Sequence, residues 1–585
     1  MNAQPTAGST VAEVVAQTLA ELGAGHCFGV VGSGNFAVTN ALVAHGVPFT
    51  PTRHEGGAAT MADAYARMSG RVGLVSVHQG CGLTNAATGI GEAAKSRTPL
   101  IVLAAEAAGA SVHSNFAMDQ ASLARSFGAV AERVHSAASA VADTVRAFRT
   151  ALEGRRTVVL NLPLDVQSQP APSTVHTAHD AGHSPSSARP PQRLSPPAPV
   201  RPAEESVREL AALIAGAQRP VFVAGRGGRG ARKEILALAE HAGALVATSA
   251  VAKGLFAGEP FSLGISGGFS SPTSAELIAG ADLIVAFGCA LNMWTMRQGH
   301  LIGEGAAVVQ VDLDHAALGA HRPVTLGVVG DSGATAAAVL EALGAGLGAT
   351  GTGAARTGYR TEEVRERIAA SSRWQDVLTE DLSGPGADGL ERIDPRELTR
   401  RLDALLPAER IVAVDSGNFM GYPSQYLDVP DEFGFCFTQA FQSIGLGLAT
   451  AIGAALAQPG RLPVLGTGDG GFLMGIAELE TAVRLRLPLV CIVYNDAAYG
   501  AEVHHFGADD PGADLSTVTF PDTDIAALAR GFGCEAATVR TLADLSAVER
   551  WLASGDGRPD RPLVLDAKIA SDGGAWWLHE AFKGH

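Results

Sequence analysis

The sequence has little of what marks several common protein classes. It contains only six cysteines in 585 residues, widely spaced and with no Cys-x-x-Cys pair, so neither a zinc ribbon nor a disulfide scaffold is expected. No long apolar run is free of polar interruptions, and the N-terminus has no basic stretch followed by an apolar core. We therefore predict no membrane span and no secretory signal, and we expect a protein of the reducing cytoplasm.

Positive charge is also scarce. Lys and Arg total 43 against 59 Asp and Glu, which gives a net charge of −16. A chain this acidic lacks the basic surface of a nucleic-acid binder and is repelled by anionic lipid, so we expect a small-molecule ligand. Hydrophobic residues make up 46% of the chain, enough for several buried cores, and the 70 glycines indicate many tight turns and close backbone approaches.

Short apolar runs bounded by Gly or Pro predict the fold class. Such runs are typical of strands buried on both faces of a parallel sheet. We predict an α/β protein of three domains with mostly parallel sheets, covering residues 1–167, 204–345 and 386–585 and joined by linkers at 168–203 and 346–385. The predicted strands lie at 72–77, 100–105 and 158–163, then at 221–225, 283–288 and 308–314, and last at 411–414, 463–467, 489–494 and 563–567.

An internal repeat relates the first and third domains. VGSGNF at 31–36 recurs as VDSGNF at 414–419, RVGLVSVHQG at 71–80 matches RLPVLGTGDG at 461–470, and TPLIVLAAE from 98 matches LPLVCIVYND from 487. The offsets of 383, 390 and 389 keep the order and nearly keep the spacing. Two copies of one α/β unit are therefore expected, with a site between them.

One glycine-rich turn in the third domain carries an acid suited to a metal. Gly468, Asp469, Gly470 and Gly471 follow a predicted buried strand, and Asp496 comes 27 residues after Asp469, at the end of the next strand. Both acids then lie at the carboxyl edge of the sheet, where open α/β sheets bind ligands. Glycines at a helix start admit phosphate oxygens, and Mg²⁺ binds one or two carboxylates together with such oxygens.

The segment GDGGFLMGIAELETAVRLRLPLVCIVYND resembles the thiamine-diphosphate-binding motif of the family that includes acetolactate synthase, benzoylformate decarboxylase and pyruvate decarboxylase. The likeness covers nearly the whole chain and is strongest to acetolactate-synthase-like proteins. It implies that Asp469, Asp496 and the backbone oxygen of Ala498 bind Mg²⁺. The family commonly has Asn where this chain has Asp496.

The resemblance also assigns residues to the rest of the cofactor. Glu55 falls where the family has the glutamate that hydrogen-bonds the pyrimidine ring, and carboxyl groups of this kind promote proton transfer. Within FQSIG at 441–445, Ile444 corresponds to the apolar residue under the bent cofactor, with Ser443 beside it. Asn418 is expected to border the diphosphate. In this family the glutamate reaches the cofactor of a neighbouring subunit, which implies a homodimer or homotetramer with sites between subunits.

Three residues bear on the reaction, and they leave it open. His78 and Gln79 lie where benzoylformate decarboxylase has an active-site histidine, and Glu502 stands where pyruvate decarboxylases have a catalytic glutamate. Overall likeness favours decarboxylation of a 2-oxo acid with carboligation to a second carbonyl, whereas His78 and Glu502 favour simple decarboxylation that releases an aldehyde. Histidine and carboxyl side chains can supply the proton that the second outcome needs.

The central domain raises the last alternatives. Its turn GRGGRG at 225–230 is of a type that can hold a dinucleotide, and acetolactate synthases bind FAD in this domain. A lone turn of this kind is weak evidence, so FAD is not favoured. A dinucleotide-dependent oxidoreductase would need an acid about 20 residues further on, and Glu240 comes too early. A non-catalytic regulatory relative would be expected to lose Glu55 or Asp469, and both are present.

Overall fold

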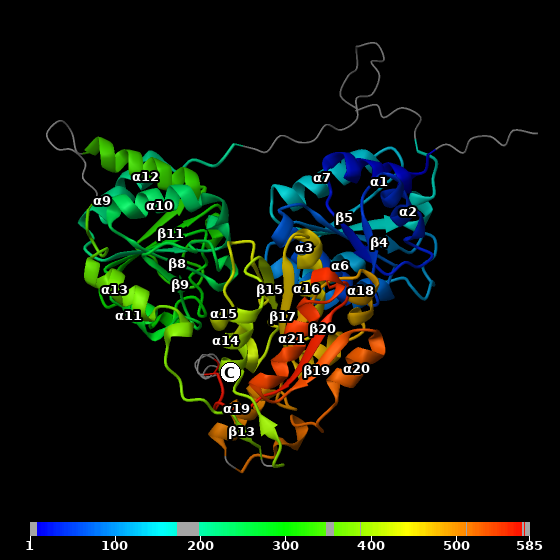
Figure 1. Cartoon of the computed structure of the whole chain (residues 1–585). Coiled ribbons are helices and arrows are strands. Elements are labelled where there is room, and N and C mark those ends of the chain that lie inside the picture. The colour runs from blue at the N-terminus through cyan, green and yellow to red at the C-terminus, as the bar shows by residue number, and fades with distance from the viewer. Residues whose placement is uncertain are drawn as a thin grey trace, which may run out of the picture.

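Three six-stranded parallel sheets organise the chain. The computed structural model describes residues 9–171, 198–346, 356–386, 388–510, 512–557, 559–575 and 578. Each domain has one sheet covered by helices on both faces, with the first domain blue to cyan, the central domain green and the third yellow to red in Figure 1. Helices α3 (Glu55–Ser69) and α16 (Gly447–Ala457) join the first and third domains, and the central domain stands to one side. The predicted fold class is therefore confirmed.

The first and third domains share one topology. The first sheet has the order β2-β1-β3-β4-β6-β5 and the third has β16-β15-β17-β18-β20-β19, so each strand has its counterpart in the same place. This identity supports the duplication expected from the sequence repeat. The strands of the first sheet are β1 Cys27–Gly29, β2 Phe49–Pro51, β3 Gly73–Val77, β4 Leu100–Glu106, β5 Val130–Arg133 and β6 Thr157–Pro163; those of the third are β15 Arg410–Val414, β16 Phe435–Phe437, β17 Leu462–Gly468, β18 Val490–Asn495, β19 Glu535–Val539 and β20 Leu563–Lys568.

The first five helices of each duplicated domain also correspond, since α1 to α5 and α14 to α18 take the same places among the corresponding strands in chain order. Helix α1 begins after Thr10, which forms a capping box with Glu13. The first domain contains α1 Val11–Leu22, α2 Phe36–Ala44, α3 Glu55–Ser69, α4 Cys81–Asn85, α5 Ala87–Lys95, α6 Gln120–Ser126, α7 Ala140–Leu152 and α8 Leu164–Gln167; the third contains α14 Pro395–Leu405, α15 Gly421–Tyr426, α16 Gly447–Ala457, α17 Asp469–Gly475, α18 Glu478–Arg484, α19 Gly500–Asp509, α20 Ile525–Phe532 and α21 Ser546–Leu552.

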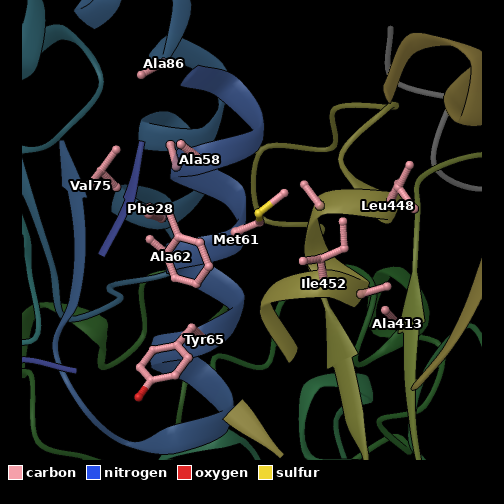
Figure 2. Close-up of a cluster of buried hydrophobic side chains, with 14 of the residues drawn as sticks. Phe28, Ala58, Met61, Ala62, Tyr65, Val75, Ala86, Ala413, Leu448 and Ile452 are labelled. Atoms are coloured by element: carbon pink, nitrogen blue, oxygen red, sulfur yellow. The ribbon is translucent and has the colours of Figure 1, made fainter. Parts of the chain in front are cut away.

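The interface between the first and third domains is a pair of small-residue helices. Met61 of α3 points toward Leu448 and Ile452 of α16, and all three side chains are buried (Figure 2). At Gly453 the backbones nearly touch, because a Cβ atom there would lie 2.2 Å from the carbonyl oxygen of Met61. The two domains therefore form one hydrophobic core across this contact.

The central domain is built on a different strand order. Its sheet runs β12-β11-β10-β7-β8-β9, so the order reverses between β7 and β10, which is where doubly wound sheets bind nucleotides. The strands are β7 Pro220–Ala224, β8 Leu245–Thr248, β9 Ser262–Ile265, β10 Leu283–Phe287, β11 Ala307–Asp312 and β12 Leu326–Val329, covered by α9 Glu204–Gly216, α10 Arg232–Ala242, α11 Pro272–Ala279 and α12 Ser332–Gly346.

The stretch predicted as the second linker contains a helix. Helix α13, Glu362–Ser371, begins after Thr361, whose side chain accepts a hydrogen bond from the backbone N–H of Val364. Val364 and Ile368, one turn apart, pack into the core of the central domain. Two apolar residues in an otherwise charged segment give a weak periodic signal, which explains why the sequence predicted a linker here. Most of the first predicted linker, 172–197, lies outside the described residues.

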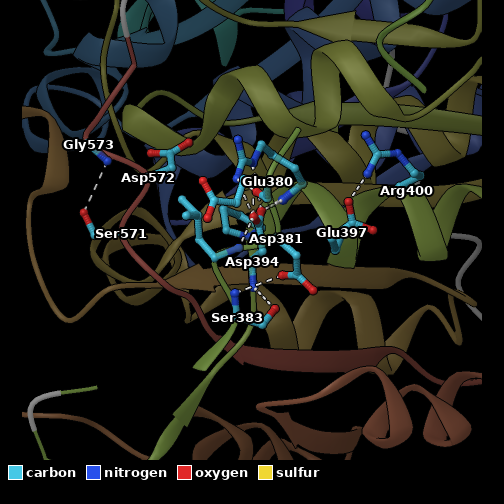
Figure 3. Close-up of polar contacts among 12 residues, drawn as sticks. Glu380, Asp381, Ser383, Asp394, Glu397, Arg400, Ser571, Asp572 and Gly573 are labelled. Carbon is cyan, nitrogen blue, oxygen red and sulfur yellow. Dashed lines mark hydrogen bonds and ion pairs between the residues drawn. The ribbon is translucent and has the colours of Figure 1, made fainter. Parts of the chain in front are cut away.

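Polar contacts fix the segment that leads into the third domain. Asp394 caps α14 by accepting from the backbone N–H of Arg396 and also accepts from that of Leu382, while Ser383 accepts from the N–H of Asp394 (Figure 3). The tail after β20 returns to this region, where Asp572 accepts a hydrogen bond from Tyr422. Within the described part of the chain, no helix has the length and apolar character required to cross a bilayer. All six cysteines are unpaired.

Candidate active site

The glycine-rich turn and its two acids meet at the carboxyl edge of the third sheet. Strand β17 ends at Gly468 and α17 begins at Asp469, so the turn lies at a strand end and a helix start. Asp496 follows β18, the neighbouring parallel strand, whose Tyr494 is in register with Gly468. The structure therefore brings Asp469 and Asp496 together, as the sequence predicted.

The two carboxyl groups have raised pKa values. Burial raises the pKa of Asp469 to about 6. Asp496 faces a cavity, and desolvation by the surrounding protein together with the charge of Asp469 raises its pKa to about 8. Two acids that resist ionisation side by side form a donor set suited to a divalent cation, which would favour both charged forms. Among the described residues no group of three His, Cys, Asp or Glu side chains forms a metal cluster, so remaining ligands would be backbone or phosphate oxygens.

The glycines of the turn are required because the space around them is crowded. A Cβ at Gly470 would lie 2.6 Å from the Tyr499 ring, and one at Gly471 would lie 2.6 Å from a carboxylate oxygen of Asp415. No larger residue fits either position without displacing its neighbours. The turn thus brings closely packed backbone at a helix start to the lining of a cavity, and such a site suits phosphate oxygens.

A cavity of about 1650 Å³ runs from this corner to the central domain. Its lining includes Asn418, Ile444, the turn Gly468–Gly471, Asp496 and Ala498. Asn418 is fixed at the start of a 3-10 turn because its amide oxygen accepts from the backbone N–H of Ala575, which leaves its NH₂ group as the donor. Ser443 is not on the lining, although both of its chain neighbours, Gln442 and Ile444, are. Its hydroxyl donates a hydrogen bond to the carbonyl oxygen of Ile444.

Glu502 enters the same cavity from another element. It lies in the first turn of α19, half-buried and on the cavity lining. The next histidine, His504, packs against Gly574 of the C-terminal tail. Glu502 therefore lies on the wall of the cavity that contains the two acids, as its assignment required.

Glu55 occupies the corresponding edge of the first domain. It is the first residue of α3, only 9% exposed, and one of its carboxylate oxygens accepts from the side-chain amide of Asn85 at 3.1 Å. His54 caps the helix by accepting from the backbone N–H of Gly56. This arrangement gives Glu55 the partly desolvated environment that its assigned role requires.

His78 lies near Glu55, and Gln79 follows it in the chain. Gly82 lies between His78 and Glu55, since a Cβ at Gly82 would lie 3.2 Å from Cβ of His78 and 3.5 Å from Oε1 of Glu55. The His78 ring contacts Phe116 edge-on, with its Nε2 3.4 Å from Oγ of Ser33. The side-chain oxygen of Gln79 is buried without a hydrogen-bond partner in the described structure.

One chain thus holds two half-sites. Glu55, His78 and Gln79 form one on the first domain, and none of them is among the described residues that line the cavity of the third domain. Because the two domains are related copies, each presents its half-site at the carboxyl edge of its own sheet.

Three further buried acids lie near these half-sites, and the sequence pointed to only one of them, Asp415. Asp415 accepts from the backbone N–H of Gly445 at 3.1 Å and from Thr467, and burial raises its pKa to about 6. Glu92 and Glu478 accept backbone N–H groups across the domain interface. The repeat offered one signal for Asp415, which precedes the recurrent Ser-Gly-Asn-Phe; the two glutamates gave none.

Family models match all three domains. The N-terminal thiamine pyrophosphate (TPP) binding domain of thiamine pyrophosphate enzymes matches residues 9–125, the central domain of these enzymes matches 207–343, and their C-terminal TPP binding domain matches 415–567. The first and third matches contain the two half-sites, and together the three span more than half of the chain.

Similar proteins agree with this assignment. The chain is 30% identical to an assigned 2-ketoarginine decarboxylase of Pseudomonas aeruginosa over 96% of this chain and 94% of that protein. It is 28% identical to sulfoacetaldehyde acetyltransferase of Alcaligenes xylosoxydans (92% and 89%) and 26% identical to acetolactate synthase of Bacillus subtilis (95% and 93%). A solved structure from Mycobacterium smegmatis, assigned as a thiamin diphosphate-dependent enzyme, shares the fold with a TM-score of 0.75 at 22% identity, covering 96% of this chain and 100% of that one. The chain therefore belongs to the thiamine pyrophosphate enzyme family and is a thiamine-diphosphate-dependent enzyme.

Proposed function

We propose that this enzyme uses thiamine diphosphate and Mg²⁺ to decarboxylate a 2-oxo acid and to join the remaining fragment to a second carbonyl compound. The observation that carries the proposal is the pair of acids, Asp469 and Asp496, beside a turn that only glycines can form. The pair favours a cation, and the turn favours phosphate. Relatives named as an acetyltransferase, a decarboxylase and an acetolactate synthase support this reaction class.

The third domain would hold the diphosphate end of the cofactor. Asp469, Asp496 and the backbone oxygen of Ala498 would bind Mg²⁺, the turn Gly468–Gly471 would admit phosphate oxygens, and the NH₂ group of Asn418 would donate to them. Thiamine diphosphate, when bound, supplies a carbon nucleophile that adds to a keto group and accepts the electron pair released with CO₂.

The chain's own residues would prepare the other end of the cofactor. Glu55 would hydrogen-bond the pyrimidine ring and favour the tautomer that removes the reactive proton. Ile444, held by the loop before α16, would support the cofactor from below with Ser443 beside it. The partial burial of Glu55 supports this role because it strengthens a hydrogen bond to a neutral ring.

The separation of the half-sites supports an assembly of at least two chains. Glu55 on the first domain of one protomer would complete the cavity on the third domain of its partner. The same contact would form a second time, with the two protomers exchanged, by the two-fold symmetry of the dimer. We therefore expect a cytoplasmic homodimer or homotetramer whose sites lie between subunits.

Two fates remain for the decarboxylated fragment, and one observation favours the second. Glu502 lies on the wall of the cavity with the two acids, and His78 lies beside Glu55. Either side chain could deliver a proton and release an aldehyde. The alternative function is therefore simple decarboxylation, and the product distinguishes the two.

FAD is not favoured in the central domain. Its glycines are explained by contacts within the protein, since a Cβ at Gly225 would lie 2.2 Å from the carbonyl oxygen of Gly288 and one at Gly227 would lie 2.8 Å from its Cα. These residues let the turn after β7 pack against the end of β10. A purified protein without flavin absorbance is the expected result.

A product screen tests the proposed function. The purified enzyme, with thiamine diphosphate and Mg²⁺, would be incubated with a panel of 2-oxo acids, alone and with aldehyde or keto acceptors, and the products identified by mass spectrometry. Hydroxy ketones support carboligation and aldehydes support the alternative. Absence of CO₂ release from every 2-oxo acid, in enzyme that binds the cofactor by calorimetry, would contradict both.

Glu55→Gln gives a second test at one residue. Glutamine keeps the size of the side chain but cannot exchange the proton, so we expect activity to fall roughly tenfold or more while cofactor binding persists. Calorimetry measures the binding and CO₂ release measures the activity. Unchanged activity would refute the assigned role of Glu55.

A further inference from the structure

A buried carboxylate of the third domain holds the backbone that precedes Glu55. Glu478 begins α18 and is 3% exposed. Its Oε1 accepts hydrogen bonds from the backbone N–H groups of Arg53 and His54, both at 3.0 Å, and its Oε2 accepts from Thr481 at 2.7 Å. The two bonded N–H groups belong to the last residues before Glu55.

The start of α3 is shaped around this carboxylate. A Cβ at Gly57 would lie 2.5 Å from Oε1 of Glu478, so the first turn of α3 can rest on the carboxylate only because residue 57 is glycine. Glu55 lies between the two bonded residues and this glycine. Its backbone is therefore fixed on both sides by one side chain from another domain.

The duplicated half of the molecule contains the same device in reverse. Glu92 of α5, in the first domain, is fully buried and accepts from the backbone N–H groups of Ala440 at 3.1 Å and Phe441 at 2.6 Å. Those residues lie in the loop between β16 and α16, which corresponds to the loop between β2 and α3 that Glu478 holds. That loop leads to Ile444. Each domain thus uses a buried glutamate to hold the functional loop of the other.

We propose that Glu478 is a positioning residue that sets the direction of the Glu55 carboxyl. This inference rests on the proposed role of Glu55. Charged acceptors bond N–H groups more strongly than neutral ones, and a buried acceptor is costly to remove because the donors lose their partner. Without Glu478, the N–H groups of Arg53 and His54 would be unsatisfied and the first turn of α3 would be free to shift. A displacement of about 1 Å at a reacting group costs up to about a hundredfold in rate.

Glu480 provides a matched control on the same helix. It also bonds Arg53, but through the guanidinium and at the surface, where the Arg53 and Glu480 side chains are 52% and 30% exposed. Glu480→Ala therefore removes a contact between the same two segments without releasing the backbone before Glu55. Glu478→Gln is the conservative variant, because its amide oxygen can accept both N–H groups and its NH₂ group can donate to Thr481.

The experiment measures exchange of the cofactor's C2 proton with deuterated solvent, by NMR after acid quench, in assembled enzyme with thiamine diphosphate and Mg²⁺. We expect Glu478→Ala to slow exchange about tenfold or more, Glu478→Gln to restore at least half of the rate, and Glu480→Ala to leave it unchanged. The dissociation constant of the cofactor, measured by calorimetry, should change less than about threefold in all three variants, because the diphosphate end is untouched.

A double variant separates positioning from general damage. If Glu478 acts through Glu55, Glu478→Ala should slow exchange no further in a Glu55→Gln background. Unchanged exchange in Glu478→Ala, or an equal further loss in the Glu55→Gln background, would overturn the inference. If Glu478→Ala does not fold, Glu478→Asp, which shortens the reach by one methylene, is judged by the same criteria. Failure of the wild-type enzyme to accelerate exchange over free cofactor would instead contradict the proposed function.

Discussion

Gly453→Ala tests the contact that joins the duplicated domains. A Cβ at this position would lie 2.2 Å from the carbonyl oxygen of Met61, whereas real Cβ contacts stay beyond 3.0 Å, so α3 and α16 must separate by about 1 Å. A gap of that size forfeits a quarter to a half of the dispersion energy of the atoms along it. Overpacking of this kind costs about 1–3 kcal/mol.

The perturbation also reaches both half-sites. Helix α3 begins at Glu55, and α16 begins three residues after Ile444, so a shift of either helix moves a functional group. We therefore expect a lower unfolding temperature by calorimetry and slower CO₂ release than in the parent enzyme.

Gly531→Ala is the matched control. Gly531 also lies within a helix of the third domain, and a Cβ there would meet nothing within 4 Å. Alanine should stabilise this helix by about 0.5–1 kcal/mol and leave activity unchanged. If Gly453→Ala unfolds at the same temperature as Gly531→Ala and retains full activity, the proposed rigidity of the α3–α16 contact is wrong.

Three further outcomes are expected. Asp469→Asn should abolish Mg²⁺-dependent binding of thiamine diphosphate in calorimetry, because it removes one charged ligand; binding at the parent affinity would contradict the metal assignment. Without cofactor, the unfolding temperature should fall as the pH rises from 6 to 8, because the pKa of Asp496 is raised to about 8 in the folded protein and the unfolded chain has already lost that proton; Asp496→Asn should lose this contribution. Glu502→Gln should lower aldehyde release about tenfold or more relative to hydroxy ketone formation, and an unchanged product ratio would exclude Glu502 as the proton donor.

Local patterns predicted most of the fold. The strands at the centre of each sheet were found because parallel strands covered on both faces are continuous apolar runs, whereas shorter strands nearer the sheet edges, such as β8 and β16, were not predicted. The repeat predicted the shared topology because the duplicated turns kept their glycines. Helix α13 was missed since only Val364 and Ile368 mark its buried face. Its position depends on packing against the central domain, which no local pattern reports.

The site residues likewise divide into those that local sequence patterns predict and those that they do not. Asp469 and Asp496 were predictable because each follows a strand, and strand ends of a parallel sheet meet at one edge. Glu478 and Glu92 were not, because a glutamate on a short helix has the same local pattern whether it faces solvent or another domain. Their partners are backbone N–H groups more than 300 residues away, and backbone donors leave no mark in a sequence.

The interface between the first and third domains has a consequence for how the polypeptide could be divided into two fragments. A fragment that ends at residue 171 would carry Met61 on an uncovered helix and Glu92 without its two backbone N–H donors. The complementary fragment would expose Ile452 and leave Glu478 without the N–H groups of Arg53 and His54. We expect neither fragment to fold stably alone, although the surfaces that they expose are complementary in shape, polarity and charge. When the two fragments are expressed together from separate genes, we expect these complementary surfaces to associate and restore the enzyme.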